Sequence, residues 1–550
     1  MNFDTVLVPP RREACVAAGL WVNRTINDYL DACVARHPDK VALTSLRTEN
    51  MEVRRFTYLE LGTMADRVAV GLSRLGVAHG DVVSVQLPNW WEFTATYLAC
   101  SRIGAVFNPL MPIFRERELS FMLRHCEAKV VIVPKRFRGF DYEQMLTQLK
   151  VSLPAMSNMI IVDGQGPNSF QALLSGPAWE RDEDASAILS RSRPGPDDVT
   201  QLMFTSGTTG EPKGVMHTAN TVLANLLPFS SRMQMSDEDV ILMASPMAHQ
   251  VGFLYGMLLP VVLGGRAVLQ DIWKPEIAAT LIRDEACTFT AGSTPFLSDL
   301  TKHVAESCAG VPTLRIFQCA GAPIPAALVE EGRRALGTKI VSGWGMTEVG
   351  VATLINLDDD DGLAANTDGY PLPGVEIKVV DEYDSPAAPG QEGRMLIRGC
   401  SNFAGYLRRP ELNSTDEAGW FDTGDLARMS AQGYIRISGR SKDVIIRGGE
   451  NIPVVEIEAM LYRHPAVHMA AIVSYPDDRL SERACATVVV KPGKHLDFEG
   501  MVGFLKSQKV ALQYIPEKLI VLDAMPTTPS GKVQKFKLRE MVRDEAAKSA

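Results

Sequence analysis

The sequence lacks both a membrane-spanning run and an excess of positive charge. Its longest apolar stretch, residues 251–263, contains a proline and is shorter than the ~20 residues that a membrane helix needs. The formal net charge is -9 at pH 7, whereas nucleic-acid-binding proteins usually carry a basic patch that neutralises phosphates. We therefore expect neither an integral membrane association nor a nucleic-acid partner.

Paired cysteines and an export signal are also missing. Nine cysteines, an odd number, are scattered from Cys15 to Cys485 without a C-x-x-C pair. This pattern argues for free thiols in a reducing compartment rather than for disulfides or a zinc site. The start, MNFDTVLVPPRRE, has no apolar core or cleavage site for secretion. These features predict a cytoplasmic protein.

What is present is typical of an α/β fold. A chain of 550 residues exceeds what one hydrophobic core normally serves, so we expect two or more domains. Capping boxes at Thr25 and Thr57 predict the starts of two helices, and Asn89 is expected to cap a third. Strand patterns such as residues 82–87 and 130–133 alternate with these helices. The alternation predicts parallel sheets with helices on both faces and ligands at the strand ends.

The pattern of predicted helices and strands changes twice along the chain. From Tyr370 onward, short strands and turns predict a small β subdomain. After residues 439–443, GRSKD, a compact pattern of helices and strands runs to the C-terminus over ~100 residues, a normal domain size. We therefore expect a large N-terminal domain, residues 1–440, with two α/β sheet subdomains and the β subdomain. A small α+β C-terminal domain, residues 441–550, follows it.

The densest cluster of chemically useful residues is TSGTTGEPKG, residues 205–214, directly after a predicted strand. Gly207, Gly210 and Gly214 permit a close backbone approach to a ligand, and Lys213 adds a compact cation that suits phosphate. The spacing is not that of a Walker A loop, because Pro212 precedes the lysine. A flexible polar surface loop is the alternative. The hydroxyl donors of this predicted polyphosphate cradle are Thr205, Ser206, Thr208 and Thr209.

This loop resembles the ATP-phosphate loop of the adenylate-forming superfamily, which includes acyl-CoA synthetases, peptide-synthetase adenylation domains and beetle luciferases. The resemblance covers nearly the full length. The run from LVPPRREAC to ARHPDK and the segment QLPNWWEF are particularly similar to cyclohexanecarboxylate-CoA ligases and to short- and medium-chain acyl-CoA synthetases. It implies ATP, magnesium and coenzyme A, and a mobile C-terminal domain.

The resemblance also assigns nucleotide contacts. GWGMTE, residues 343–348, matches the second nucleotide motif, in which Thr347 donates to phosphate and Glu348, with Thr205, holds magnesium. An ordinary turn with a surface glutamate is the alternative. Asp425 matches the residue that accepts the ribose hydroxyls, although a turn aspartate is a commoner fate. The remaining nucleotide contacts implied are Gly321, Ala322, Pro323, Gly345, Met346, Ile437 and Arg440.

Two further segments carry the predicted catalytic cycle. In TTPSGKVQK, residues 527–535, the resemblance identifies Lys532 as the catalytic lysine, whereas composition alone does not favour it over Lys535. Its charge would hold the substrate carboxylate against the α-phosphate. Lys442 matches the hinge about which the C-terminal domain swings between the two half-reactions. The residues expected to line the CoA tunnel afterwards are Arg447, Gly448, Gly449 and Glu450.

The predicted activity is ATP-dependent conversion of a carboxylic acid to its CoA thioester, with release of AMP and pyrophosphate. Gly345, where acetate-specific relatives have tryptophan, indicates a deep acyl pocket for a small-to-medium aliphatic or alicyclic acid. Aryl or long-chain acids, loading of a carrier protein, a luciferase-like oxygenase and a nucleotide-binding regulator are the alternatives, and a homodimer is one option for assembly. The expected pocket residues are His249, Phe253, Phe296, Ala320, Trp344 and Gly345.

Overall fold

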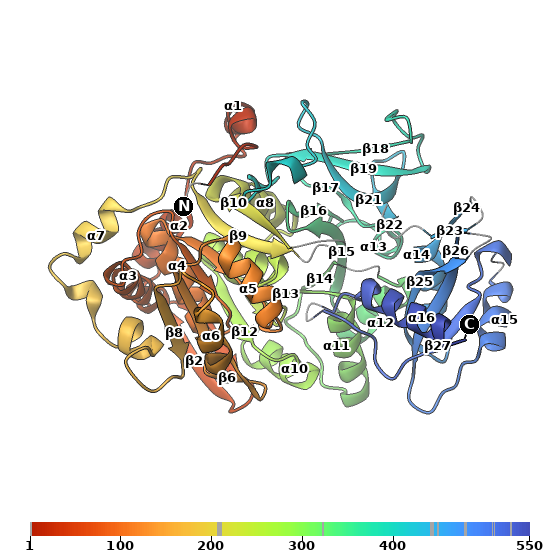
Figure 1. Ribbon diagram of the computed structural model, residues 1–550, viewed down its shortest axis with the longest axis horizontal. Coiled ribbons are helices and arrows are strands. Elements are labelled where there is room, and N and C mark those ends of the chain that lie inside the picture. The colour runs from red at the N-terminus through yellow and green to blue at the C-terminus, as the bar shows by residue number, and fades with distance from the viewer. Residues whose placement is uncertain are drawn as a thin grey trace.

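The predicted α/β fold is confirmed (Figure 1). The computed structural model describes residues 3–205, 212–321, 324–440, 445–447, 450–477, 481–508, 510, 512–528 and 531–549. Among these residues, the structure contains no helix with the length and apolar character needed to cross a bilayer. All nine cysteines are free thiols.

The larger sheet has nine strands and lies at the centre of the molecule. Its middle strands are parallel, and antiparallel strands close both edges. In spatial order its strands are β17 (Tyr370–Pro371), β16 (Gly350–Leu354), β15 (Lys339–Met346), β14 (Ile316–Cys319), β13 (Phe289–Gly292), β11 (Val240–Met243), β12 (Arg266–Gln270), β1 (Val41–Arg47) and β2 (Glu52–Thr57).

The second sheet has seven strands, of which β10 and β20 run antiparallel at one edge. In spatial order its strands are β20 (Gly405–Tyr406), β10 (Lys213–Thr218), β9 (Val199–Thr205), β4 (Val106–Pro109), β3 (Val82–Val85), β5 (Val130–Pro134) and β8 (Asn158–Val162). The pair β6 (Arg136–Phe137) and β7 (Phe140–Asp141) forms a small separate hairpin. One hydrophobic core includes residues of both large sheets.

Helices cover the two sheets and complete this core. Both predicted capping boxes are confirmed, since the backbone N–H groups of Thr25 and Thr57 donate to Asp28 and Glu60 at 2.7 and 2.8 Å. The helices are α1 (Pro9–Ala17), α2 (Ile26–Arg36), α3 (Tyr58–Arg74), α4 (Trp91–Ile103), α5 (Glu116–His125), α6 (Tyr142–Lys150), η1 (Gln171–Ser175), η2 (Trp179–Arg181), α7 (Ala185–Arg191), α8 (Ala219–Arg232), η3 (Gly252–Leu258), α9 (Leu259–Leu263), α10 (Pro275–Asp284), α11 (Thr294–Ser307), α12 (Ala326–Leu336), α13 (Asp361–Asn366) and η4 (Pro410–Leu412).

The predicted cap at Asn89 is wrong. Helix α4 begins after Trp90 without a side-chain cap, and the Asn89 amide crosses to the other sheet instead. It donates to the carbonyls of Ser245 and Gln270 at 2.9 and 3.2 Å, and it accepts from the N–H of Met247 at 2.8 Å. These long-range bonds join the two sheets directly.

The β subdomain and the C-terminal domain each have a core of their own. Figure 1 shows the C-terminal elements in blue, beside α11 and α12 and below the β subdomain. The antiparallel β subdomain consists of β18 (Val375–Val380), β19 (Glu392–Gly399), β21 (Phe421–Met429) and β22 (Ile435–Arg440). The C-terminal elements are β23 (Ile445–Arg447), β24 (Glu450–Ile452), α14 (Val454–Tyr462), β25 (Val467–Asp477), β26 (Ser481–Val490), α15 (Phe498–Ser507), η5 (Leu512–Tyr514), β27 (Lys518–Val521) and α16 (Lys535–Ser549).

Candidate active site

The motif residues gather at the carboxyl ends of strands from both large sheets. Thr205 ends β9 and Gly321 follows β14, while Thr347 follows β15 and His249 follows β11. In open α/β sheets, ligands bind in the crevice outside the carboxyl ends of the strands. The fold therefore brings the predicted nucleotide and acyl residues to one region.

Glu348 is buried, with 5% of its surface exposed. Its carboxylate accepts a 2.7 Å hydrogen bond from the Tyr406 hydroxyl, and its backbone carbonyl accepts one from the N–H of Phe403 at 2.7 Å. Burial raises the pKa of this carboxyl, while the Tyr406 hydrogen bond and the charges of Lys213 and Arg440 pull it back down. The predicted metal ligand is thus a desolvated carboxylate that faces two cations.

Lys213 opens β10 opposite Thr205, its partner in the β9–β10 ladder. Its ammonium lies 4.6 Å from the centre of the Tyr406 ring. A cation over an aromatic face is attracted by the ring quadrupole. Lys213 and Glu348, the predicted phosphate and metal residues, therefore share a single aromatic neighbour.

Asp425 is 3% exposed and lies at the centre of a second cluster. One of its oxygens pairs with Nε of Arg440 at 2.9 Å, and the other accepts from the Trp344 indole at 2.9 Å. Trp344 packs in the core of the β subdomain, so it belongs to this cluster and not, as predicted, to the wall beside His249. A carboxylate has about four lone-pair sites, so Asp425 retains capacity for ribose hydroxyls.

The turn that carries Thr347 is held by His217, a residue that the sequence reasoning missed. Nε2 of this buried histidine lies 2.8 Å from the Thr347 carbonyl, and Nδ1 lies 3.0 Å from the Thr221 hydroxyl. Because a carbonyl only accepts, Nε2 carries the proton. Burial lowers the pKa of His217 to about 4, so the ring is neutral near pH 7.

A second missed residue holds the other side of the same turn. The Asn225 amide donates to the carbonyls of Val349 and Val351 at 3.1 and 2.8 Å and accepts from the Tyr255 hydroxyl at 2.6 Å. Gly350 has a φ of +70°, and a Cβ there would lie 2.6 Å from the Asn225 side chain. Only glycine suits this close approach.

On the acyl side, His249 follows β11 at the strand-end edge. Burial lowers the pKa of His249 to about 4, and the positive charge of Lys532 lowers it further. Phe253, by contrast, is fully buried, with its ring 5.0 Å from that of Tyr97 and 6.0 Å from that of Phe107. Phe253 exposes no surface in this structure, and its place in the pocket wall stays a prediction.

Phe296 and Ala320 keep small exposed fractions of 6% and 7%. The Phe296 ring lies 4.8 Å from the ring of Trp273, and the N–H of Ala320 donates to the carbonyl of Gly292 at 3.1 Å. Both residues follow the ends of neighbouring parallel strands, β13 and β14. They supply apolar surface at the same edge of the sheet as His249.

The pocket depth expected at Gly345 stays a prediction, but the backbone around this residue is tightly packed. A Cβ on this residue would lie 2.2 Å from the carbonyl oxygen of Gly350 and 2.8 Å from Cα of Val351. The adjacent strand β16 therefore fills the space that a side chain would need. The GWGM segment is itself part of β15, so strand packing alone already favours glycine at this position.

The loop that bears Lys532 docks on the N-terminal domain. A Cβ on Gly531 would lie 2.6 Å from the Ser293 hydroxyl and 3.0 Å from the Pro295 ring. The loop is closed by mutual bonds, since the N–H of Thr528 donates to the Lys532 carbonyl at 2.7 Å and Lys532 N–H donates to the Thr528 hydroxyl at 3.0 Å. Ser293 directly precedes α11 and follows β13, so the Lys532 loop lies at the strand-end edge.

Two predicted residues, Arg447 and Glu450, lie in strands of the C-terminal domain, whereas Met346 directly precedes Thr347 at the end of β15. Arg447 forms a 2.7 Å ion pair with Glu517 inside the C-terminal domain, and Glu450 begins β24 there. Met346 and Ile437 pack at the edge of the β-subdomain core. The predicted residues outside the described part of the chain are Ser206, Gly207, Thr208, Thr209, Gly210, Ala322, Pro323, Lys442, Gly448 and Gly449.

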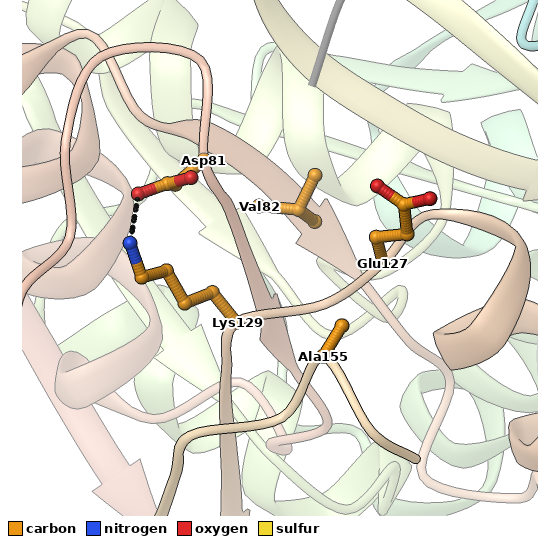
Figure 2. Close-up of a pocket in the computed structure, with 5 residues that line it drawn as sticks. All are labelled: Asp81, Val82, Glu127, Lys129 and Ala155. Atoms are coloured by element: carbon orange, nitrogen blue, oxygen red, sulfur yellow. Dashed lines mark hydrogen bonds and ion pairs between the residues drawn. The ribbon is translucent and has the colours of Figure 1, made fainter.

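A hollow of about 220 Å³ lies elsewhere on the surface (Figure 2). Its lining comes from the amino ends of the parallel strands β3, β5 and β8, the edge opposite to the one that carries the motifs. Figure 2 shows Lys129 paired with Asp81, at 2.7 Å. This hollow is therefore not the active site. It is lined by Asp81, Val82, Glu127, Lys129 and Ala155.

Two sheets with a shared ligand edge, a β subdomain and a small C-terminal domain docked through a lysine loop define the fold of the adenylate-forming enzymes. Residues 30–407 match the AMP-binding enzyme family, and residues 456–532 match the AMP-binding enzyme C-terminal domain. The chain belongs to this family and is an AMP-forming acid–CoA ligase.

Relatives and solved structures agree over nearly the full length. The medium-chain fatty-acid–CoA ligase of Escherichia coli (strain K12) is 39% identical, over 96% of this chain and 92% of its own. The salicylyl-CoA synthase / salicylate adenylyltransferase of a Streptomyces species is 33% identical, over 96% of each. MatB from Rhodopseudomonas palustris, 26% identical over 95% of this chain and 100% of its own, has a TM-score of 0.81 in its ATP-bound form and 0.69 in its apo form.

Proposed function

We propose that this ligase activates a small-to-medium aliphatic or alicyclic carboxylic acid, of the cyclohexanecarboxylate type, and transfers it to CoA. The observation that carries the proposal is the docking of the Lys532 loop against Ser293 and Pro295, at a strand-end edge where Phe296 and Ala320 supply apolar surface. A single cation in apolar surroundings suits a carboxylate with a hydrocarbon tail. The 39% identity to a medium-chain fatty-acid–CoA ligase supports this choice.

The proposed chemistry has two steps. Lys532 holds the carboxylate against the α-phosphate of ATP, a carboxylate oxygen attacks phosphorus, and the bond to pyrophosphate breaks. The CoA thiolate then attacks the acyl carbon of the acyl-AMP and AMP leaves. Residues 205–210 with Lys213 and Thr347 would cradle the phosphates, and Asp425 would accept the ribose hydroxyls. Arg440, already paired with Asp425, lies beside them.

Magnesium fits the residues present. Glu348 and Thr205 offer the hard oxygen ligands that this ion prefers, and Glu348 is a buried carboxylate. Within the described ranges, no group of three or more acidic, histidine or cysteine side chains would hold a metal without help. We therefore infer that the ion arrives with the nucleotide. When bound, it would neutralise charge on the phosphate oxygens.

We further propose that the two half-reactions use different domain arrangements, with residues 1–440 and 441–550 as the moving parts and Lys442 as the hinge. The higher TM-score to the ATP-bound form of MatB supports the reading that the present arrangement serves adenylation. Rotation would then withdraw Lys532 and bring residues 447–450 to the CoA tunnel. Lys442→Pro should keep pyrophosphate exchange and lose thioester formation, and an unchanged second step would exclude a swing at this point.

An aryl acid is the second candidate substrate, because relatives at 32–33% identity are named for salicylate, 2,3-dihydroxybenzoate and naphthoate. Loading of a carrier protein in place of CoA stays the other alternative predicted from the sequence. We also expect a cytoplasmic location, supported by nine free thiols, and a homodimer, which light scattering would test.

One assay series separates these functions. Purified protein with ATP and magnesium is given a panel of aliphatic, alicyclic and aromatic acids, and exchange of labelled pyrophosphate into ATP is measured. CoA is then added and the thioester is detected by mass spectrometry. We expect medium-sized hydrocarbon acids to lead in both steps. Preference for hydroxybenzoates would favour the second candidate, and absence of exchange with every acid would exclude adenylation altogether.

A further inference from the structure

Tyr406 contacts both of the charged groups that face the predicted phosphate and metal positions. Its hydroxyl donates to Oε1 of Glu348 at 2.7 Å, and its ring centre lies 4.6 Å from the Lys213 ammonium. One side chain therefore spans the cation and the carboxylate. Neither the motifs nor the family resemblance pointed to it, and it lies about 190 residues from Lys213 along the chain.

The backbone fixes this tyrosine firmly. Strand β20 pairs with β10 so that Tyr406 faces Val215, two residues beyond Lys213. The N–H of Tyr406 donates to the Asn413 side chain at 3.0 Å, and its ring lies 4.7 Å from the ring of Phe403. Only 4% of the residue is exposed. Because these contacts restrict the Tyr406 side chain, we expect it to limit the positions that Lys213 and Glu348 can take.

The direction of the hydrogen bond is defined. A carboxylate only accepts hydrogen bonds, so the Tyr406 hydroxyl is the donor in its 2.7 Å contact with Oε1 of Glu348. Glu348 accepts this bond through one of its two carboxylate oxygens, Oε1. Groups that orient a metal-binding carboxylate from behind strengthen metal binding by restricting it to one geometry.

We propose that Tyr406 is a positioning residue that fixes the Lys213 ammonium and the Glu348 carboxylate relative to each other, so that a nucleotide–metal complex meets both in register. The proposal rests on the phosphate and metal roles proposed above for these two residues. It assigns separate tasks to the two parts of the side chain: the hydroxyl orients Glu348, and the ring supports Lys213.

Two substitutions separate these tasks. Tyr406→Phe keeps the ring and removes the hydroxyl, so it should weaken binding of the metal about 10-fold and leave affinity for metal-free ATP unchanged. Tyr406→Leu removes both parts and should weaken metal-free ATP binding about threefold as well. Metal binding is read from electron paramagnetic resonance of Mn²⁺ with a non-hydrolysable ATP analogue. ATP binding is read by calorimetry in EDTA.

Tyr434→Phe is the matched control. The Tyr434 hydroxyl also donates to a carboxylate, that of Asp359 at 2.8 Å, but this pair lies apart from Lys213 and Glu348. We expect wild-type Mn²⁺ and ATP binding in this variant. Equal Mn²⁺ affinity in Tyr406→Phe, Tyr434→Phe and the wild type would overturn the proposal. Because these readouts need no acid substrate, they are distinct from a failure of wild-type pyrophosphate exchange, which would count against the proposed function.

Discussion

The charge of Lys532, near the C-terminus, acts on the imidazole of His249 in the N-terminal domain. Burial is the larger cause of the low pKa of His249, about 4, and the lysine adds to it. His249 is consequently neutral in the physiological range. Lys532 is then the group that supplies positive charge at this point for an incoming carboxylate.

Lys532→Ala should reduce pyrophosphate exchange by 100-fold or more, on the order of the effect of removing one electrostatic stabiliser of a transition state. Thioester formation from supplied acyl-AMP should change little, because the lysine is withdrawn for that step. Both half-reactions are followed by mass spectrometry of products. Equal losses in the two would contradict this division of labour.

Lys535→Ala is the control for the lysine prediction. Lys535 pairs with Glu458 at 2.7 Å within the C-terminal domain, and Glu458 also accepts from the N–H of Ile472. Removing one partner of a largely buried pair costs about 3 kcal/mol. The variant should therefore melt earlier and still catalyse exchange in its folded fraction.

Gly345→Trp should destabilise the protein and should not redirect it to acetate. Any Cβ at this position meets the backbone of β16, so the strands must separate before a side chain fits. Gly503→Ala serves as a control, because a Cβ there meets nothing within 4 Å and alanine favours the helix α15 by about 1 kcal/mol. Thermal unfolding and acid preference are measured together. A folded Gly345→Trp enzyme with a new preference for acetate would support the pocket-depth interpretation.

Acid should destabilise the protein in part through His217. Its folded pKa, about 4, lies below the unfolded value of about 6.5, so between these values the unfolded chain binds more protons. The contribution of His217 to the free energy of unfolding is fully present above pH 6.5 and is lost as the pH falls towards 4. At pH 5 this contribution has fallen by about 2 kcal/mol.

His217→Gln tests this dependence. Glutamine can place an N–H near the position of Nε2 and keep the bond to the Thr347 carbonyl, but it does not titrate. The melting temperature of the variant should fall less than that of the wild type between pH 7 and pH 5. Asparagine cannot reach that carbonyl in the same way, so His217→Asn should also raise the KM for ATP. An equal fall in melting temperature between pH 7 and pH 5 for the wild type and His217→Gln would refute the role of His217 in this pH dependence.

Asn89→Ala should cost about 3 kcal/mol of stability, because it leaves buried carbonyl and N–H groups of both sheets without partners. Asn89→Asp should be worse, since a carboxylate would face the carbonyls of Ser245 and Gln270. Asn50→Ala, at an exposed position, should change stability by less than about 0.5 kcal/mol. Thermal unfolding of the three variants provides the comparison, and similar values for Asn89→Ala and Asn50→Ala would remove the bridging role.

The sequence predicted interactions between residues close in the chain and missed interactions between residues far apart in it. The capping boxes at Thr25 and Thr57 depend on residues three apart, and both are present. Asn89 fits the local rule for a cap equally well, but three partners on a distant sheet outweigh it. Tyr406 and His217 likewise act on residues far along the chain, where spacing rules carry no information. The final helix α16 was missed because charged residues break its apolar period.

Of the nine thiols, eight are buried and Cys308, directly after α11, is exposed. A maleimide dye would therefore attach at one native point on the larger domain, at the opposite end of α11 from Ser293 and Pro295, where the lysine loop docks. A second cysteine engineered on α15 would complete a pair for single-molecule energy transfer. The native sequence thus supplies one of the two labelling positions needed to measure the distance between the domains during a catalytic cycle.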